Sequence, residues 1–211
     1  MFQDVKAVFF DMGYTLVNED RVWQTRCREQ ASMEEAKKRR IKNVAIYTEM
    51  VKASVAYLSP WRTALAHFAF SQSAPYRAQF ETLYPDAVPV LAALSEKYTL
   101  GIIANQEEGL EQRLEGFGIT PYFKVVISSH DVKFVKPDPR IFTIALEKAG
   151  CAPENAVMIG DRLDNDIFPA KRLGMKTIWI RQGFGGMQTP KDERHAPDAR
   201  VETLPEILNI L

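Results

Sequence analysis

Residues 5–16 read VKAVFFDMGYTL, an apolar run that ends at Asp11 and is followed by a short loop. A short apolar run of this kind predicts a strand that is buried on both faces of a parallel sheet. Asp11 would then stand at the carboxyl end of that strand, which is the edge where open α/β sheets bind their ligands. This stretch therefore predicts both the fold and the place of a functional site.

The second half of the chain repeats the pattern. Short apolar runs rich in Val and Ile are separated by segments with helical spacing of apolar residues, and Gly150 follows one of these segments as a helix cap. The runs cover residues 100–104, 124–127, 156–159 and 176–180, and the helical segments cover 86–97, 107–117, 140–149 and 165–173. Strands that alternate with helices of about ten residues predict an α/β fold, a Rossmann-like parallel sheet flanked by helices. The tail predicts an edge strand near Arg200 and a closing helix over 204–211.

Residues 17–85 break this alternation and contain no convincing strand. Their apolar spacing predicts one helix over 21–58 and another over 61–70, with Trp23 and Trp61 as packing residues. We therefore expect a Rossmann-like core of residues 1–16 and 86–211, with a mainly helical insertion of residues 17–85 after the first strand. The glycine-rich and polar composition of residues 183–186 and 188–197 predicts a flexible loop.

Composition limits the function. The chain has 27 basic and 27 acidic residues, and this zero net charge argues against nucleic acid or an anionic membrane as a partner. No apolar stretch approaches the roughly 20 residues of a membrane span, and no secretory signal is visible. With no export signal, Cys27 and Cys151 are expected to be reduced thiols, and a cytoplasmic location is expected. Composition leaves the oligomeric state open.

Four polar segments follow predicted strands and would meet at one edge of the sheet. They contain Asp11, the pair Ala104–Asn105, Lys136, and the acidic stretch 160–166. Three carboxylates fall within six residues of that last stretch, and clustered acidic oxygens suit Mg²⁺. Asp164, the middle one, is interpreted as a solvated or helix-capping residue.

Lys136 and Asn105 could complete such a site. Pro137 and Pro139 stiffen the loop that carries Lys136, whose ammonium could orient a nucleophilic aspartate and neutralise phosphate charge. Asn105 could offer backbone and amide donors to an anion. Taken singly, a surface lysine and a turn-forming asparagine also explain these residues.

Together, the four segments resemble the haloacid dehalogenase-like hydrolase superfamily, in its capped, phosphatase-like branch. The resemblance implies that the insertion of residues 17–85 is the helical cap that many members carry. Most members are Mg²⁺-dependent phosphatases, so the resemblance implies a small phosphorylated metabolite as substrate and Mg²⁺ as cofactor. Asp11 matches the nucleophile, which forms an aspartyl-phosphate, and Lys136 matches the catalytic lysine of the third motif. The resemblance implies phosphate binding by Thr15, Ala104, Asn105 and Lys136, and metal binding by Asp11, the carbonyl of Gly13, Asp161 and Asp166.

Two positions depart from the family pattern. Gly13 stands where the family has an acid/base aspartate, and a positioned general acid contributes roughly 10²–10⁴-fold in rate. Ala104 replaces a hydroxyl residue that hydrogen-bonds the phosphoryl group, and losing such a bond costs about 1.5–3 kcal/mol.

Three readings follow from these departures. The first is a phosphatase whose leaving group needs little protonation, or whose acid comes from elsewhere; Tyr14 is conceivable there, but its ordinary pKa near 10 matches the task poorly. The second is a metal-free 2-haloacid dehalogenase, a branch that typically loses the acidic fourth motif retained here. The third is a catalytically weak protein that binds a phosphorylated ligand or a partner. The first reading predicts activity that falls steeply as the leaving-group pKa rises.

Overall fold

Six parallel strands form the main sheet of the molecule, in the order β5-β4-β1-β6-β7-β8. This computed structural model describes residues 2–211; Met1, which the predicted core range includes, lies outside the described residues. The strands are β1 (Ala7–Phe10), β4 (Thr99–Ala104), β5 (Phe123–Ser128), β6 (Ala156–Gly160), β7 (Lys176–Ile180) and β8 (Ala199–Val201). Every pairing between them is parallel, so the predicted α/β fold is confirmed.

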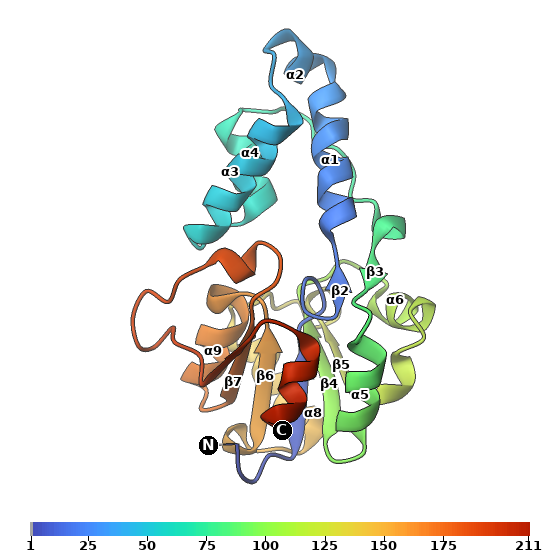
Figure 1. Cartoon of the computed structure of the whole chain (residues 1–211), viewed down its shortest axis with the longest axis vertical. Coiled ribbons are helices and arrows are strands. Elements are labelled where there is room, and N and C mark those ends of the chain that lie inside the picture. The colour runs from blue at the N-terminus through green and yellow to red at the C-terminus, as the bar shows by residue number, and fades with distance from the viewer. Residues whose placement is uncertain (1) are drawn as a thin grey trace.

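Helices cover both faces of this sheet (Figure 1). One face packs against α5 (Ala87–Ser95), α6 (Leu110–Gly116) and a closing 3₁₀ helix, Leu204–Asn209. The other face packs against α8 (Pro139–Ala149) and α9 (Phe168–Arg172), and the short α7 (Ser129–Val132) follows β5. In β1, Val8 and Phe10 join the first apolar layer, and Ala7 and Phe9 join the second. These two layers hold β1 at the centre of the sheet and so fix the position of Asp11.

Four helices stand beyond the carboxyl ends of the strands, and we call them the cap helices (Figure 1). They are α1 (Asp20–Ser32), α2 (Glu34–Lys38), α3 (Asn43–Val55) and α4 (Pro60–His67). The prediction of one helix over 21–58 was wrong, because Met33 is extended and Arg40 has a left-handed φ of 57°. Each of these residues interrupts the helical hydrogen bonding. Across residues 2–211, no helix combines the length and apolar character needed to cross a bilayer.

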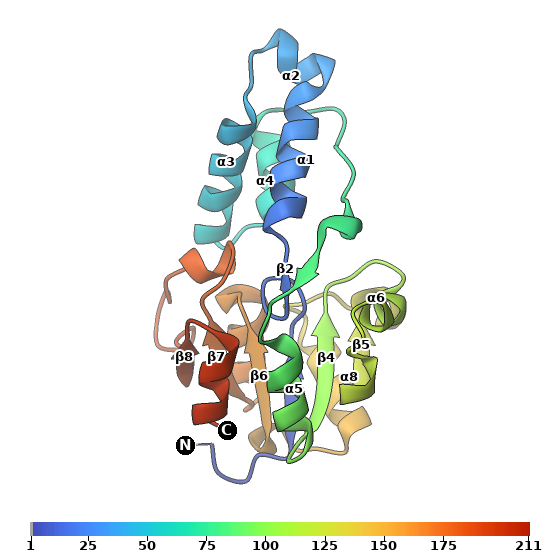
Figure 2. The ribbon, with the colours of Figure 1, turned by 45° about the vertical axis from the view of Figure 1, so that its right-hand side comes forward.

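The chain enters and leaves the cap helices through a pair of short strands (Figure 2). Strand β2 (Val17–Asn18) pairs antiparallel with β3 (Thr82–Leu83), which a 3₁₀ turn, Ala78–Phe80, precedes. The sequence predicts no strand in residues 17–85, because strands of two residues are too short to show an alternation of apolar residues. The paired strands hold the two connections side by side.

The loop after β7 is packed against the cap helices, although the sequence predicted it to be flexible. Phe184 is buried in the apolar cluster of the cap together with Tyr14, and the short 3₁₀ helix Gly185–Met187 follows it. Gln188 is also buried: its Nε2 donates to the Ser54 carbonyl at 2.9 Å, and its Oε1 accepts from the Leu163 N–H at 2.7 Å. This loop therefore links α3 to the core.

Candidate active site

Asp11 is held at the end of β1 by its backbone and by the loop that follows. Its N–H donates to the Ile159 carbonyl of β6 at 2.9 Å. The loop then folds around Met12, whose carbonyl accepts the N–H groups of Thr15, Leu16 and Val17 at 3.3, 3.0 and 3.0 Å. This fold brings the buried hydroxyl of Thr15 to 3.4 Å from Asp11 Oδ2, to which it donates.

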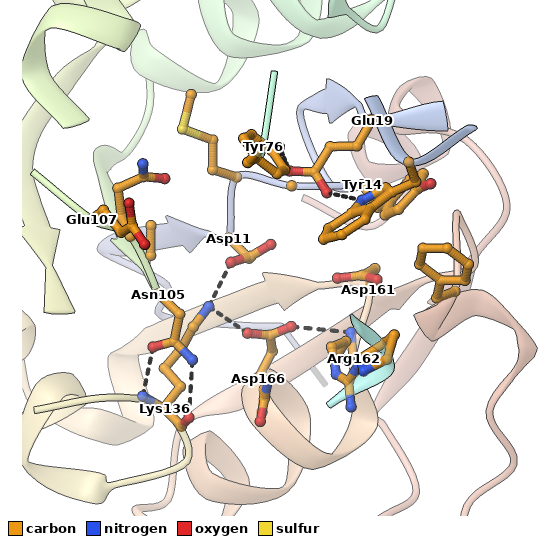
Figure 3. A pocket seen from close by; sticks show the side chains of 18 of the residues that line it. Asp11, Tyr14, Glu19, Tyr76, Asn105, Glu107, Lys136, Asp161, Arg162 and Asp166 are labelled. Atoms are coloured by element: carbon orange, nitrogen blue, oxygen red, sulfur yellow. Dashed lines mark hydrogen bonds and ion pairs between the residues drawn. The ribbon is translucent and has the colours of Figure 1, made fainter. Parts of the chain in front are cut away.

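Lys136 joins two of the predicted acidic residues (Figure 3). Its Nζ donates to Asp11 Oδ1 and to Asp166 Oδ1, both at 2.6 Å, and to the Ile103 carbonyl at 2.8 Å. Burial by itself lowers the pKa of Lys136, but the two carboxylates outweigh it and hold the pKa above its ordinary value. The ammonium is therefore charged, and all three of its donors are used.

Asn105 holds the backbone of Lys136. Its Nδ2 donates to the Lys136 carbonyl at 2.9 Å, and its Oδ1 accepts the Lys136 N–H at 2.7 Å. This pair of hydrogen bonds fixes the loop on which the lysine stands and leaves one amide N–H of Asn105 for an anion. Ala104, the last residue of β4, is buried and lines the same cavity.

The carboxylates of Asp11, Asp161 and Asp166 converge, each with an oxygen within 4.8 Å of the others. Asp161 follows β6, and Asp166 lies in the π-helical turn Leu163–Ile167 behind it. Two glycines make room for these side chains: a Cβ at Gly160 would lie 2.5 Å from the Asp166 carboxylate, and one at Gly185 would lie 2.4 Å from Asp161 Oδ2.

The charges of this cluster do not balance among the groups that contact one another. When all three carboxylates are ionised they face one ammonium, which leaves two negative charges. Burial raises the pKa of Asp161 well above its usual value, and the neighbouring Asp11 and Asp166 carboxylates raise it further. Buried oxygen ligands that lack positive charge match what a divalent cation such as Mg²⁺ binds. The donor set therefore fits that ion.

Asp164 lies apart from this cluster. Its carboxylate pairs with the Arg162 guanidinium at 2.7 Å and accepts a hydrogen bond from Gln188 Nε2 at 2.9 Å. Its interpretation as a solvated or capping residue was wrong, because the side chain is mostly buried in this ion pair. Neither the pairing with Arg162 nor the contact with Gln188 could be inferred from the spacing of the acidic residues.

The acidic cluster forms the floor of a cavity of about 390 Å³, and the cap side supplies much of its wall. Trp23 lines this wall and also packs edge-on against Tyr76, with ring centroids 5.4 Å apart, so it has both a packing and a lining role. Residues that sequence reasoning did not select also line the cavity: Glu19, Arg26, Tyr76, Gln106, Glu107, Arg113 and Phe184. The cavity has room for a small molecule above Asp11.

Glu19 directs its carboxyl group into this wall (Figure 3). Its Oε2 accepts the indole N–H of Trp23 at 2.8 Å, and its Oε1 lies 2.8 Å from the Tyr76 hydroxyl. Burial raises the pKa of Glu19 to about 7, against the hydrogen bond from Trp23, which lowers it. In the sequence Glu19 is only an acidic residue before a helix, and no local signal marks it as functional.

Tyr14 serves a different purpose. It is buried, its hydroxyl donates to Asp20 Oδ1 at 3.0 Å, and its ring meets Phe184 edge-on with centroids 5.5 Å apart. Burial and the Asp20 carboxylate raise the pKa of this phenol far above its ordinary value. Tyr14 is therefore a packing residue and a poor source of protons.

Comparison with known proteins identifies the family of this chain. Residues 8–180 match the family profile of the haloacid dehalogenase-like hydrolases. The chain belongs to the haloacid dehalogenase-like hydrolase family. The resemblance carried by Asp11, Asn105, Lys136 and Asp161 is thereby confirmed at the level of the family.

Individual members of this family show how far the likeness extends. A glyceraldehyde 3-phosphate phosphatase of Methanopyrus kandleri is 36% identical over 133 residues, covering 61% of this chain and 56% of that protein. A phosphoserine phosphatase of Thermus thermophilus is 32% identical over 175 residues, covering 76% of this chain and 69% of that protein. The crystal structure of a phosphatase of this family from Thermococcus onnurineus is 27% identical, with a TM-score of 0.70, and the match covers 98% and 97% of the two chains.

Proposed function

We propose that this chain is a Mg²⁺-dependent phosphatase that acts on a small phosphorylated metabolite through an aspartyl-phosphate on Asp11. One observation carries the proposal: the Asp11 carboxylate stands on the floor of the cavity, beside Lys136 and two further buried carboxylates. The names of the similar phosphatases support the same reaction type.

The chain's own residues provide the positioning that such a reaction needs. An oxygen of Asp11 attacks phosphorus while the bond to the leaving oxygen breaks, and water later releases phosphate from the aspartyl-phosphate. Lys136 holds Asp11 by its contact with Oδ1 and offsets part of the repulsion between carboxylate and phosphate. Asn105 keeps Lys136 in place through its two backbone hydrogen bonds.

Asp11, Asp161 and Asp166 would hold the Mg²⁺ ion, together with the carbonyl of Gly13, which lines the same cavity. When bound, the ion would supply the positive charge that brings a carboxylate and a phosphate dianion together. The acidic cluster also weighs against a dehalogenase, since metal-free displacement of halide from carbon has no use for two uncompensated negative charges.

A panel of phosphometabolites, assayed with and without Mg²⁺, tests the proposal. Wild-type protein should release phosphate only with the metal, and Asp11→Asn and Asp161→Asn should abolish that turnover. Asp131→Asn is the matched control, because Asp131 is an exposed acid on α7 outside the cavity. Chloride release from 2-haloacids without metal would instead indicate a dehalogenase, and phosphate-ester binding without turnover would indicate a binding protein.

A further inference from the structure

The Glu19 carboxyl group lies where a side chain at position 13 would extend. An ideal Cβ built on Gly13 would meet Glu19 Oε1 at 2.7 Å, its Cδ at 3.0 Å and its Oε2 at 3.2 Å. All three atoms of the carboxyl group therefore border the space that Gly13 leaves open. The glycine and the carboxyl group are complementary, since a larger residue at position 13 would displace Glu19.

The contacts of Tyr76 indicate that this carboxyl group carries a proton. The Tyr76 hydroxyl lies 2.8 Å from Glu19 Oε1 and 2.5 Å from Glu81 Oε1, yet a phenol has only one proton to donate. Glu81 is buried and forms a two-pronged ion pair with Arg113, at 2.5 and 3.1 Å, so it is the charged partner. Tyr76 thus donates to Glu81, and the second contact needs a proton on Glu19.

We propose that Glu19 is the acid/base residue of this site and replaces the side chain that Gly13 lacks. The inference rests on the proposed phosphatase function. Glu19 lines the cavity above Asp11 (Figure 3) and directly precedes α1 in the chain. The proton donor is therefore supplied from the start of the cap segment rather than from the loop after β1.

Both half-reactions balance with this assignment. In the first, Asp11 forms a bond to phosphorus, the bond to the leaving oxygen breaks, and Glu19 gives that oxygen its proton, which yields an alcohol. In the second, water attacks phosphorus, the bond to Asp11 breaks, and Glu19 takes the proton of the water. The Trp23 N–H, 2.8 Å from Oε2, stabilises the intervening carboxylate.

The substitution Glu19→Gln separates this role from a structural one. A glutamine amide can donate to Tyr76 and accept from Trp23, as the protonated carboxyl group does, but it has no acidic proton to transfer. With an alkyl phosphate, whose leaving group needs protonation, turnover should fall about 10²–10⁴-fold. With an aryl phosphate, whose leaving group departs as a stable anion, the fall should be about tenfold at most.

A matched control and a rescue complete the test. Glu29→Gln changes an acid on α1, the helix that Glu19 precedes. Glu29 pairs with Arg77, and its substitution should leave both turnovers unchanged. The double variant Gly13→Asp with Glu19→Ala should recover alkyl phosphate turnover relative to Glu19→Ala alone.

Two outcomes would overturn the role of Glu19 without contradicting the proposed phosphatase function. They are equal losses of turnover on both substrates, and a wild type that already fails to hydrolyse alkyl phosphates. A wild type inactive on every ester would overturn the proposed function itself.

Discussion

Lys136 Nζ lies 2.6 Å from Asp11 Oδ1, and this contact places a buried ammonium directly on the proposed nucleophile. The lysine side chain is 2% exposed, so the charge has almost no access to water. Its removal would leave the carboxylates of Asp11 and Asp166 without their shared partner. The lysine is therefore expected to serve both the reaction and the stability of the fold.

We expect Lys136→Met to lower the free energy of unfolding by about 3 kcal/mol, the range seen when a buried charge loses its partner. Urea denaturation should show this loss, and added Mg²⁺ should recover part of it by binding the native carboxylates. Lys97→Met is the control, because Lys97 is exposed and its substitution should change stability by less than about 0.5 kcal/mol. A variant as stable as the wild type would contradict this account of the cluster.

Gly185→Ala should weaken metal binding. A Cβ at this position would lie 2.4 Å from both the carbonyl and the Oδ2 of Asp161, so that carboxylate must move. Disturbing the groups around a metal ligand typically costs about 10–100-fold in affinity, and we expect a loss in that range. The Mg²⁺ dependence of turnover and calorimetric titration would measure it.

Gly116→Ala serves as the comparison for that substitution. A Cβ added at Gly116, at the end of α6, meets no atom within 4 Å, so the change should stabilise the helix by about 0.5–1 kcal/mol. It should leave the affinity for Mg²⁺ unchanged. Similar losses of affinity in both variants would show that the effect does not arise at Asp161.

Phe184→Ala should destabilise the protein by about 3 kcal/mol, because it leaves a cavity in the apolar cluster of the cap helices. Thermal and urea unfolding would measure the change. Met187→Ala in the same loop removes a side chain from a residue that is 49% exposed, so it should have an effect below about 0.5 kcal/mol. Equal effects of the two substitutions would mean that the loop does not pack against the cap.

Cys27 should resist alkylation in the native protein. It is buried, and that burial raises the pKa of its thiol to about 11. Since the thiolate is the reactive form, only about one molecule in a thousand is reactive at pH 8, and reactivity should rise about tenfold for each pH unit toward that pKa. Mass spectrometry after iodoacetamide treatment of a Cys151→Ser variant would isolate this thiol, with the urea-unfolded variant as the reactive reference.

The parts of the fold that could be predicted are those encoded by local patterns. Residues 7–10, before Asp11, and residues 156–159, before Asp161, are apolar throughout, as strands buried on both faces must be, and both form central strands. The segmentation of the cap was missed because the extended backbone of Met33 carries no composition signal. The spacing of apolar residues predicts a periodic helix well, but it gives no sign of a single residue whose backbone departs from the helical conformation.

The parts of the site that could not be predicted depend on contacts between distant segments. Glu19 reaches the space at Gly13 only because the loop folds around Met12 and Tyr14 takes a left-handed φ of 54°. The proton on Glu19 follows in turn from Tyr76, which the chain brings back from the far end of the cap. The sequence motif shows that the carboxylate expected at position 13 is missing, whereas the fold places the carboxyl group of Glu19 beside Gly13.

Phe184 gives the cap an unusual dependence on the rest of the chain. The apolar cluster that joins α1, α3 and α4 includes this residue from the loop after β7, so the cap helices do not enclose a complete interior of their own. A cap exchanged with a relative would arrive without its matching loop. The cap is therefore not a freely portable module, because a loop from a distant part of the chain completes its interior.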